Sequence, residues 1–190
     1  MIKKVKWMSM ILICIGIVLV LIDYNLKPSV SIEDIKVDAT LQRNETNAYP
    51  HKEYIIDINM IKNKDCNVII YPYIQGLGMM TYNLNEQEDY FIPSSIGSDG
   101  VTVNLATSEL RKLNLIQDKD ELSLIGFWFP EKEGSYKSRV YLEMLDDFNK
   151  INNPVLVCVY LEEKLGKQLT WAKVFPINLG NIDWYQGKFL

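Results

Sequence analysis

The sequence has little of what recognisable catalytic sites are built from. It holds one histidine and three cysteines in 190 residues, whereas metal sites need clustered histidine, cysteine or carboxylate ligands. His51 stands alone beside Pro50 in a polar stretch and is expected to be a solvated side chain. No G-x-S-x-G, G-x-G-x-x-G or phosphate-loop motif occurs. We therefore expect no cofactor and no resident metal, and an enzyme is the less favoured interpretation.

Charge excludes a further class. The chain has 20 basic and 24 acidic residues, a net charge of -4, and residues 24–190 alone hold 17 basic and 23 acidic residues. Proteins that bind nucleic acid present basic faces. A nucleic-acid partner is therefore not expected.

The cysteines are too few for a disulfide scaffold. Cys14 lies inside an apolar run and is expected to behave as a small hydrophobic residue. Cys66 and Cys158 each lie in an apolar, strand-like run. One bridge between them is compatible with an extracytoplasmic location, but two free, buried thiols are the preferred prediction because cysteine is often buried.

One long apolar run, Trp7 to Ile22, dominates the N-terminal region. It follows Lys3, Lys4 and Lys6 and is interrupted only by Ser9 among clearly polar residues. In a bilayer such a segment must be helical, because its backbone groups have no water to bind. The basic residues before it favour a cytoplasmic N-terminus and export of the rest. We expect a transmembrane anchor near the short limit of about 17 residues.

A cleaved signal peptide is the alternative, since it has the same basic start and apolar core. The nearest small-x-small triplet, Ser29 to Ser31, lies well beyond the apolar core, so a retained anchor is preferred over a secreted product. The predicted organisation is a cytoplasmic tip and anchor over residues 1–23, a stalk over 24–31 and an extracytoplasmic domain over 32–190. Composition also resembles that of a bacterial protein.

The remainder is rich in period-2 alternation, which indicates β-strands with one buried face. The predicted strands are 35–41, 54–60, 66–74, 79–84, 89–92, 101–105, 121–129, 155–161 and 169–177. The last two are expected to form an antiparallel hairpin. Pro72 cannot donate to a ladder, so its end of the third strand should lie at an edge or a bulge. The aromatic C-terminal stretch from Asn181 to Leu190 is expected to dock on the domain.

Two helices are predicted outside the anchor. Thr107 or Ser108 could cap a short helix ending at Leu113. Between Ser138 and Asn152, apolar residues recur at helical spacing and predict one amphipathic helix. The fold class is therefore mainly β: an antiparallel β-sandwich or barrel with one late helix after an N-terminal transmembrane helix. An α+β fold is the alternative.

Aromatic residues give the best lead to a binding site. The candidates are Tyr71, Tyr73, Phe127, Trp128 and Phe129. Rings exposed on a sheet face make flat platforms for sugars or peptides. Packing in the core accounts for the same residues and is the preferred interpretation.

The functional hypothesis is a membrane-anchored extracytoplasmic binding or assembly module of the cell envelope. It implies the membrane as one partner, through Trp7 to Ile22, and an envelope protein or glycan as another. Two alternatives stay open. One is an envelope hydrolase whose carboxylates, such as Asp57, Asp89 or Glu143, converge only in the fold. The other is an accessory subunit whose apolar helix pairs with a membrane protein.

Overall fold

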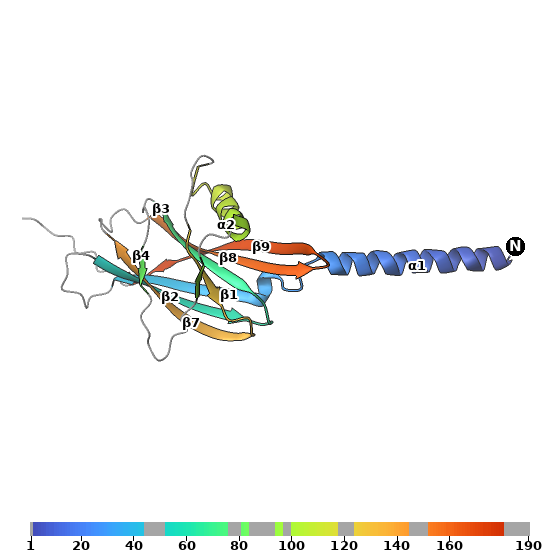
Figure 1. The fold of residues 1–190 in the computed structure, drawn as a ribbon, viewed down its shortest axis with the longest axis horizontal. Helices are drawn as coiled ribbons and strands as arrows, with labels where there is room; N and C mark the ends of the chain where they lie inside the picture. Colours follow the sequence, from blue (N-terminus) through green and yellow to red (C-terminus); the bar gives the residue numbers. More distant parts are fainter. Residues whose placement is uncertain are drawn as a thin grey trace, which may run out of the picture.

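The protein, analysed as a computed structural model, is mainly β and has a long N-terminal helix extending from one end (Figure 1). The structure describes residues 2–43, 52–75, 81–83, 94–96, 100–117, 124–144 and 152–180. These residues form two five-stranded sheets and two α-helices. The predicted mainly β, sandwich-like class is confirmed.

The first sheet has the strand order β10-β1-β2-β7-β4. Its strands are β1 (Ile35–Arg43), β2 (Lys52–Lys62), β4 (Thr81–Asn83), β7 (Gly134–Met144) and β10 (Asn178–Leu179). β2 pairs antiparallel with β1 and with β7, and only β10 runs parallel to its neighbour. A 3-10 turn, η1 (Ile32–Asp34), leads into β1.

The second sheet has the order β5-β6-β3-β8-β9 and is antiparallel throughout. Its strands are β3 (Val68–Gln75), β5 (Ser94–Ile96), β6 (Gly126–Phe129), β8 (Asn152–Lys164) and β9 (Lys167–Pro176). Pro72 pairs with Leu156 of β8, while the pairing of β3 with β6 ends at Ile70. Among the described strands Pro72 thus lies beyond the pairing of β3 with β6, and the register with β8 shifts between Tyr73 and Gln75. This agrees with the predicted edge or bulge.

The main core fills the space between the two sheets. One sheet contributes alternate residues of β1 and β2, including Leu41, Ile56 and Met60, which are fully or almost fully buried. The other contributes Ile70 and Phe127 to the same cluster. The period-2 alternation in β1 and β2 therefore arises from one face packed on a second sheet.

Helix α2 (Gly100–Lys112) covers the outer face of the second sheet, over β8 and β9 (Figure 1). The predicted strand over 101–105 is therefore wrong. The short helix predicted to end at Leu113 is present, but it begins at Gly100 and not at a cap on Thr107 or Ser108. Apolar residues alternate over 101–105 as they do in a strand. The buried residues of the helix, however, are Thr102, Ala106 and Leu110, which recur at the four-residue spacing of a helix. Ala106 and Leu110 belong to a second apolar cluster with Ile69 and Val157.

The amphipathic helix predicted between Ser138 and Asn152 is also wrong. Residues 138–144 belong to β7, which pairs with β2 along its whole length, and 152 begins β8. Ser138 and Val140 are buried and Arg139 is not, which is strand alternation. Long-range pairing with β2 overrode the helical spacing. Residues 145–151 lie outside the described residues, as do the predicted strand 89–92, the loop carrying His51 and the C-terminal stretch 181–190.

The predicted antiparallel hairpin is confirmed as β8 and β9. Its two-residue turn, Leu165–Gly166, has φ angles of 51° and 70°, the left-handed pair that suits the twist of a tight hairpin. The turn lies beside the C-terminal end of helix α1 (Ile2–Leu26) (Figure 1).

Helix α1 contains the apolar run for which a transmembrane role was predicted. Among the described residues, no helix combines the length and the apolar character that a membrane crossing requires.

Candidate functional site

The apolar side chains of α1 are exposed on every side of the helix. From Met10 to Ile22 the large ones are 48–69% exposed. Since helical residues point in all directions over such a run, the apolar surface is a full cylinder and not one stripe. A helix that is apolar all round is usually covered by protein or by lipid.

The chain between α1 and the first sheet is bound tightly to the head. The Ser29 backbone N–H donates to Glu162 Oε2 at 2.8 Å, and its hydroxyl donates to Oε1 at 2.7 Å. The Tyr160 hydroxyl donates to Glu162 Oε2 at 2.8 Å. Within the predicted stalk over 24–31, residues up to Leu26 continue α1, and Ser29 is hydrogen-bonded to Glu162 of β8.

A second contact holds the following residue. The Trp171 indole N–H of β9 donates to the Val30 carbonyl at 2.9 Å, and Val30 is buried in the main core. The Trp171 ring stacks on Tyr160 with 5.4 Å between ring centroids. The contacts at Ser29 and Val30 fix the direction in which the chain leaves the head.

Electrostatics favour the ionised form of Glu162. Burial alone would raise the pKa of its carboxyl, but hydrogen bonds from Ser29, Tyr160 and Lys164 outweigh it and lower the pKa to about 2. Burial, with the neighbouring Glu162, raises the pKa of Tyr160 to about 12. A carboxylate of such low basicity is a poor general base. Glu162 is thus held as a carboxylate by hydrogen bonds that connect Ser29 to β8.

A polar hollow of about 420 Å³ adjoins this group. Its lining includes Ser29, Cys66, Glu131 and Glu162. The Cys66 thiol is nearly buried, and burial raises its pKa. In the described part of the chain no group of three or more histidine, cysteine or carboxylate residues is arranged to hold a metal ion.

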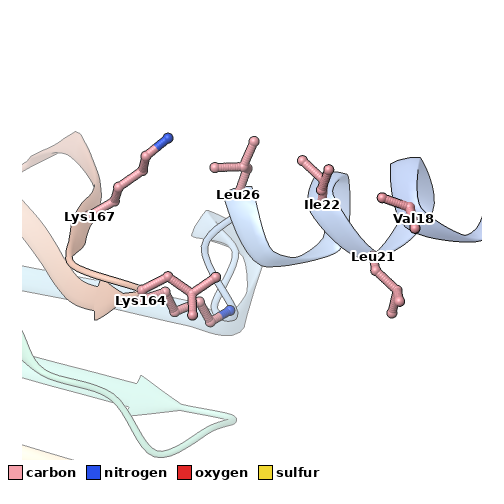
Figure 2. A pocket seen from close by; sticks show the side chains of 7 residues that line it. Val18, Leu21, Ile22, Leu26, Lys164 and Lys167 are labelled. Atoms are coloured by element: carbon pink, nitrogen blue, oxygen red, sulfur yellow. The ribbon is translucent and has the colours of Figure 1, made fainter. Parts of the chain in front are cut away.

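An apolar groove of about 240 Å³ lies between α1 and the turn joining β8 to β9. Val18, Leu21, Ile22 and Leu26 line it from the helix. Figure 2 shows Lys164 and Lys167 of the hairpin near the end of α1 that carries Leu26, with Ile22 and Val18 following along the helix. Lys164 also reaches the stalk, where its Nζ donates to the Lys27 carbonyl at 3.3 Å.

The aromatic candidates lie on two faces of the second sheet. Phe127 and Phe129 are buried in the main core, whereas Tyr71 is buried under α2, where its hydroxyl is 2.6 Å from Thr102 Oγ1. Tyr73 and Trp128 are half-buried against the cluster under α2. The five rings do not come together on one exposed surface, and they have roles in packing.

Of the carboxylates considered for hydrolysis, Asp57 lies on the outer face of the first sheet. Its oxygens accept hydrogen bonds from Arg139 Nε at 2.7 Å and Gln42 Nε2 at 2.6 Å. Asp89 lies outside the described residues. The backbone of Glu143 belongs to β7, opposite Glu53 of β2. Asp57 is thus held by a cation and an amide.

The contacts with α1 were not predicted from the sequence. Residues 162–167 fall between the two predicted strands of the hairpin, and Ser29 falls in the predicted stalk and in the disfavoured cleavage triplet. Tyr160 and Glu162 are two residues apart, which places both side chains on one face of a strand. This spacing is the sequence feature that indicates that the two side chains lie together. Their partner lies 133 residues earlier in the chain, and no local pattern indicates that pairing.

No protein-family model matches this chain, and no curated protein is similar enough to indicate a relative. The geometry of the chain itself therefore carries the functional argument.

Proposed function

We propose that the protein is a membrane-anchored binding or assembly module of the cell envelope, with the β-sandwich outside the cytoplasm and α1 in the bilayer. The observation that carries the proposal is the exposed apolar cylinder of α1. Between Met10 and Ile22 this exposed surface contains no charged side chain. Leaving that surface in water costs roughly 25 cal/mol per Å², and lipid removes this cost.

Among the described residues the apolar part of α1 is by itself too short to cross a membrane, so the proposal depends on the residues that flank it. The 25 residues of α1 extend about 37 Å at 1.5 Å per residue, against a hydrocarbon core of about 30 Å. The run from Trp7 to Ile22 is shorter than a typical span, and Trp7, Tyr24 and Lys27 can extend it at the two interfaces. The lysines at positions 3, 4 and 6 favour a cytoplasmic N-terminus.

The contacts between the sandwich and the chain that follows α1 favour a module whose binding surface has a fixed orientation. Ser29 and Val30, which follow α1 after two residues, are both bound to the second sheet, so the chain enters the sandwich at a fixed point. The partner would be an envelope protein or glycan. Orientation of this kind is useful to a protein that assembles with others at the membrane surface.

The experiment is vesicle flotation of the full chain after alkaline carbonate washing, comparing wild type with Ile15→Lys. A lysine at the centre of a membrane helix costs about 3 kcal/mol, so the variant should dissociate while wild type floats. Ile15→Leu is the matched control and should float. If wild type stays at the bottom of the gradient, the proposal is wrong. A reporter fused after Leu190 that is inaccessible in intact cells would contradict the external location.

A further inference from the structure

The groove between α1 and the β8–β9 turn combines an apolar floor with a cationic rim. Val18, Ile22 and Leu26 are four residues apart and therefore lie along one face of α1. This face extends about 12 Å from Leu26 to Val18. If α1 occupies a bilayer, the deeper part of the groove lies at the level of the acyl chains.

The turn that closes the groove has an unusual residue at its tip. Leu165 is 84% exposed and has a φ of 51°, a conformation uncommon for bulky residues and favoured by glycine and asparagine. Asparagine would suit the turn better on conformational grounds. An exposed leucine at this position is stabilised if the tip enters the apolar edge of a membrane.

Two lysines flank this leucine. Lys164 lines the groove but is already bound, with its Nζ 3.3 Å from Glu162 Oε1. Lys167 is exposed, and within the described residues its ammonium group forms no ion pair. Lys167 is therefore the cation available to an anionic group at the mouth of the groove.

We propose that this groove binds one anionic phospholipid, with part of an acyl chain against Val18, Ile22 and Leu26 and the phosphate at Lys167. The tip at Leu165 then enters the membrane interface beside α1. This inference rests on the proposed membrane location of α1. The groove volume of 240 Å³ is below the roughly 300 Å³ of small-molecule pockets, which suits a segment of one chain.

The test uses the full chain in nanodiscs of equimolar phosphatidylglycerol and phosphatidylcholine. Lipids that remain bound after mild detergent extraction are counted by native mass spectrometry. Wild type should retain phosphatidylglycerol about fivefold over phosphatidylcholine, the preference expected of one lysine near anionic lipid. Lys167→Gln should reduce the ratio to about one. Leu165→Asn, which suits the turn, should lower the total amount of bound lipid.

Lys173→Gln is the matched control, because it removes the same charge from the same strand outside the groove. It should keep the wild-type ratio. Equal ratios in wild type and Lys167→Gln, or an equal loss in Lys173→Gln, would overturn the inference. Flotation with phosphatidylcholine vesicles separates the two proposals. If the chain floats but the mass spectra show no lipid preference, only the groove site is contradicted. If the chain does not float, the membrane anchor is contradicted as well.

Discussion

Glu162 on β8 accepts both the backbone N–H and the hydroxyl of Ser29, one hydrogen bond on each carboxylate oxygen, at 2.8 and 2.7 Å. The two residues are 133 positions apart in the chain. This contact, together with the Tyr160 hydroxyl, joins the segment that follows α1 to β8 close to its turn with β9. Hydrogen bonds to an ionised carboxylate are stronger than those between neutral groups. The bonds to Glu162 should therefore contribute more to the free energy of unfolding than the same number of neutral hydrogen bonds.

Replacing Glu162 by glutamine should destabilise the head by about 2 kcal/mol at neutral pH. Because the folded-state pKa of Glu162 is lowered from 4.5 to about 2, its stabilisation is complete above pH 4.5 and is lost as the pH falls towards 2. The difference in unfolding free energy between wild type and Glu162→Gln should therefore shrink over this interval. Urea unfolding of the full chain in detergent, repeated from pH 7 to pH 2, measures it.

Glu163→Gln is the control for this series, since Glu163 is the exposed neighbour on the same strand. It should change stability by less than about 0.5 kcal/mol. If the difference in unfolding free energy between wild type and Glu162→Gln stays constant down to pH 2, the charge of Glu162 does not contribute to this contact.

Local patterns were sufficient where one face of a strand is buried by a partner sheet. In β1 and β2 the apolar residues that alternate in the sequence lie in the main core, and β8 and β9 form the predicted hairpin, with strands that extend up to a two-residue turn. The same reasoning failed for α2. Val101 and Val103 alternate as in a strand, but the helix places Thr102 and Ala106 against the sheet. Tertiary contacts decided between two patterns that coexist in the sequence.

The candidate site was less predictable than the fold. The groove requires α1 and the β8–β9 turn to meet, and these lie about 140 positions apart in the sequence. The exposed Leu165 resembled any turn residue until its position beside α1 was known. By contrast, the aromatic candidates are easy to notice in the sequence because their rings are large. Two of them, Tyr71 and Phe127, are buried in the structure.

Gly126 on β6 is required by the close approach of its neighbours. A Cβ atom there would lie 2.7 Å from Tyr71 Cε1 and 2.8 Å from Ile69 Cγ2, both in the buried centre of the second sheet. Gly126→Ala should therefore destabilise the head by about 1–3 kcal/mol through overpacking. Chemical denaturation measures the loss. Gly100→Ala is the control, because a Cβ there meets nothing within 4 Å, and it should have little effect.

The hydrogen bond between Tyr71 and Thr102 connects α2 to the sheet beneath it. The two hydroxyl oxygens are 2.6 Å apart and buried. Thr102→Val keeps the shape and removes this bond, so we expect a loss of about 1 kcal/mol. A double-mutant cycle with Tyr71→Phe should give a coupling free energy of at least about 0.5 kcal/mol. Additive losses would mean that the two hydroxyls do not stabilise each other.

The two thiols of the head should be inert in the folded protein. Cys158 is completely buried and Cys66 is 6% exposed, both are free, and burial raises the pKa of each thiol, so little thiolate is present near neutral pH. In a Cys14→Ser background, an aromatic disulfide reagent at pH 8 should react with neither until guanidinium unfolds the chain, and then with both. Gln168→Cys, which adds an exposed thiol on β9, is the positive control and should react at once. Rapid reaction of Cys66 or Cys158 without denaturant would mean that the sheet around it opens on the timescale of the assay.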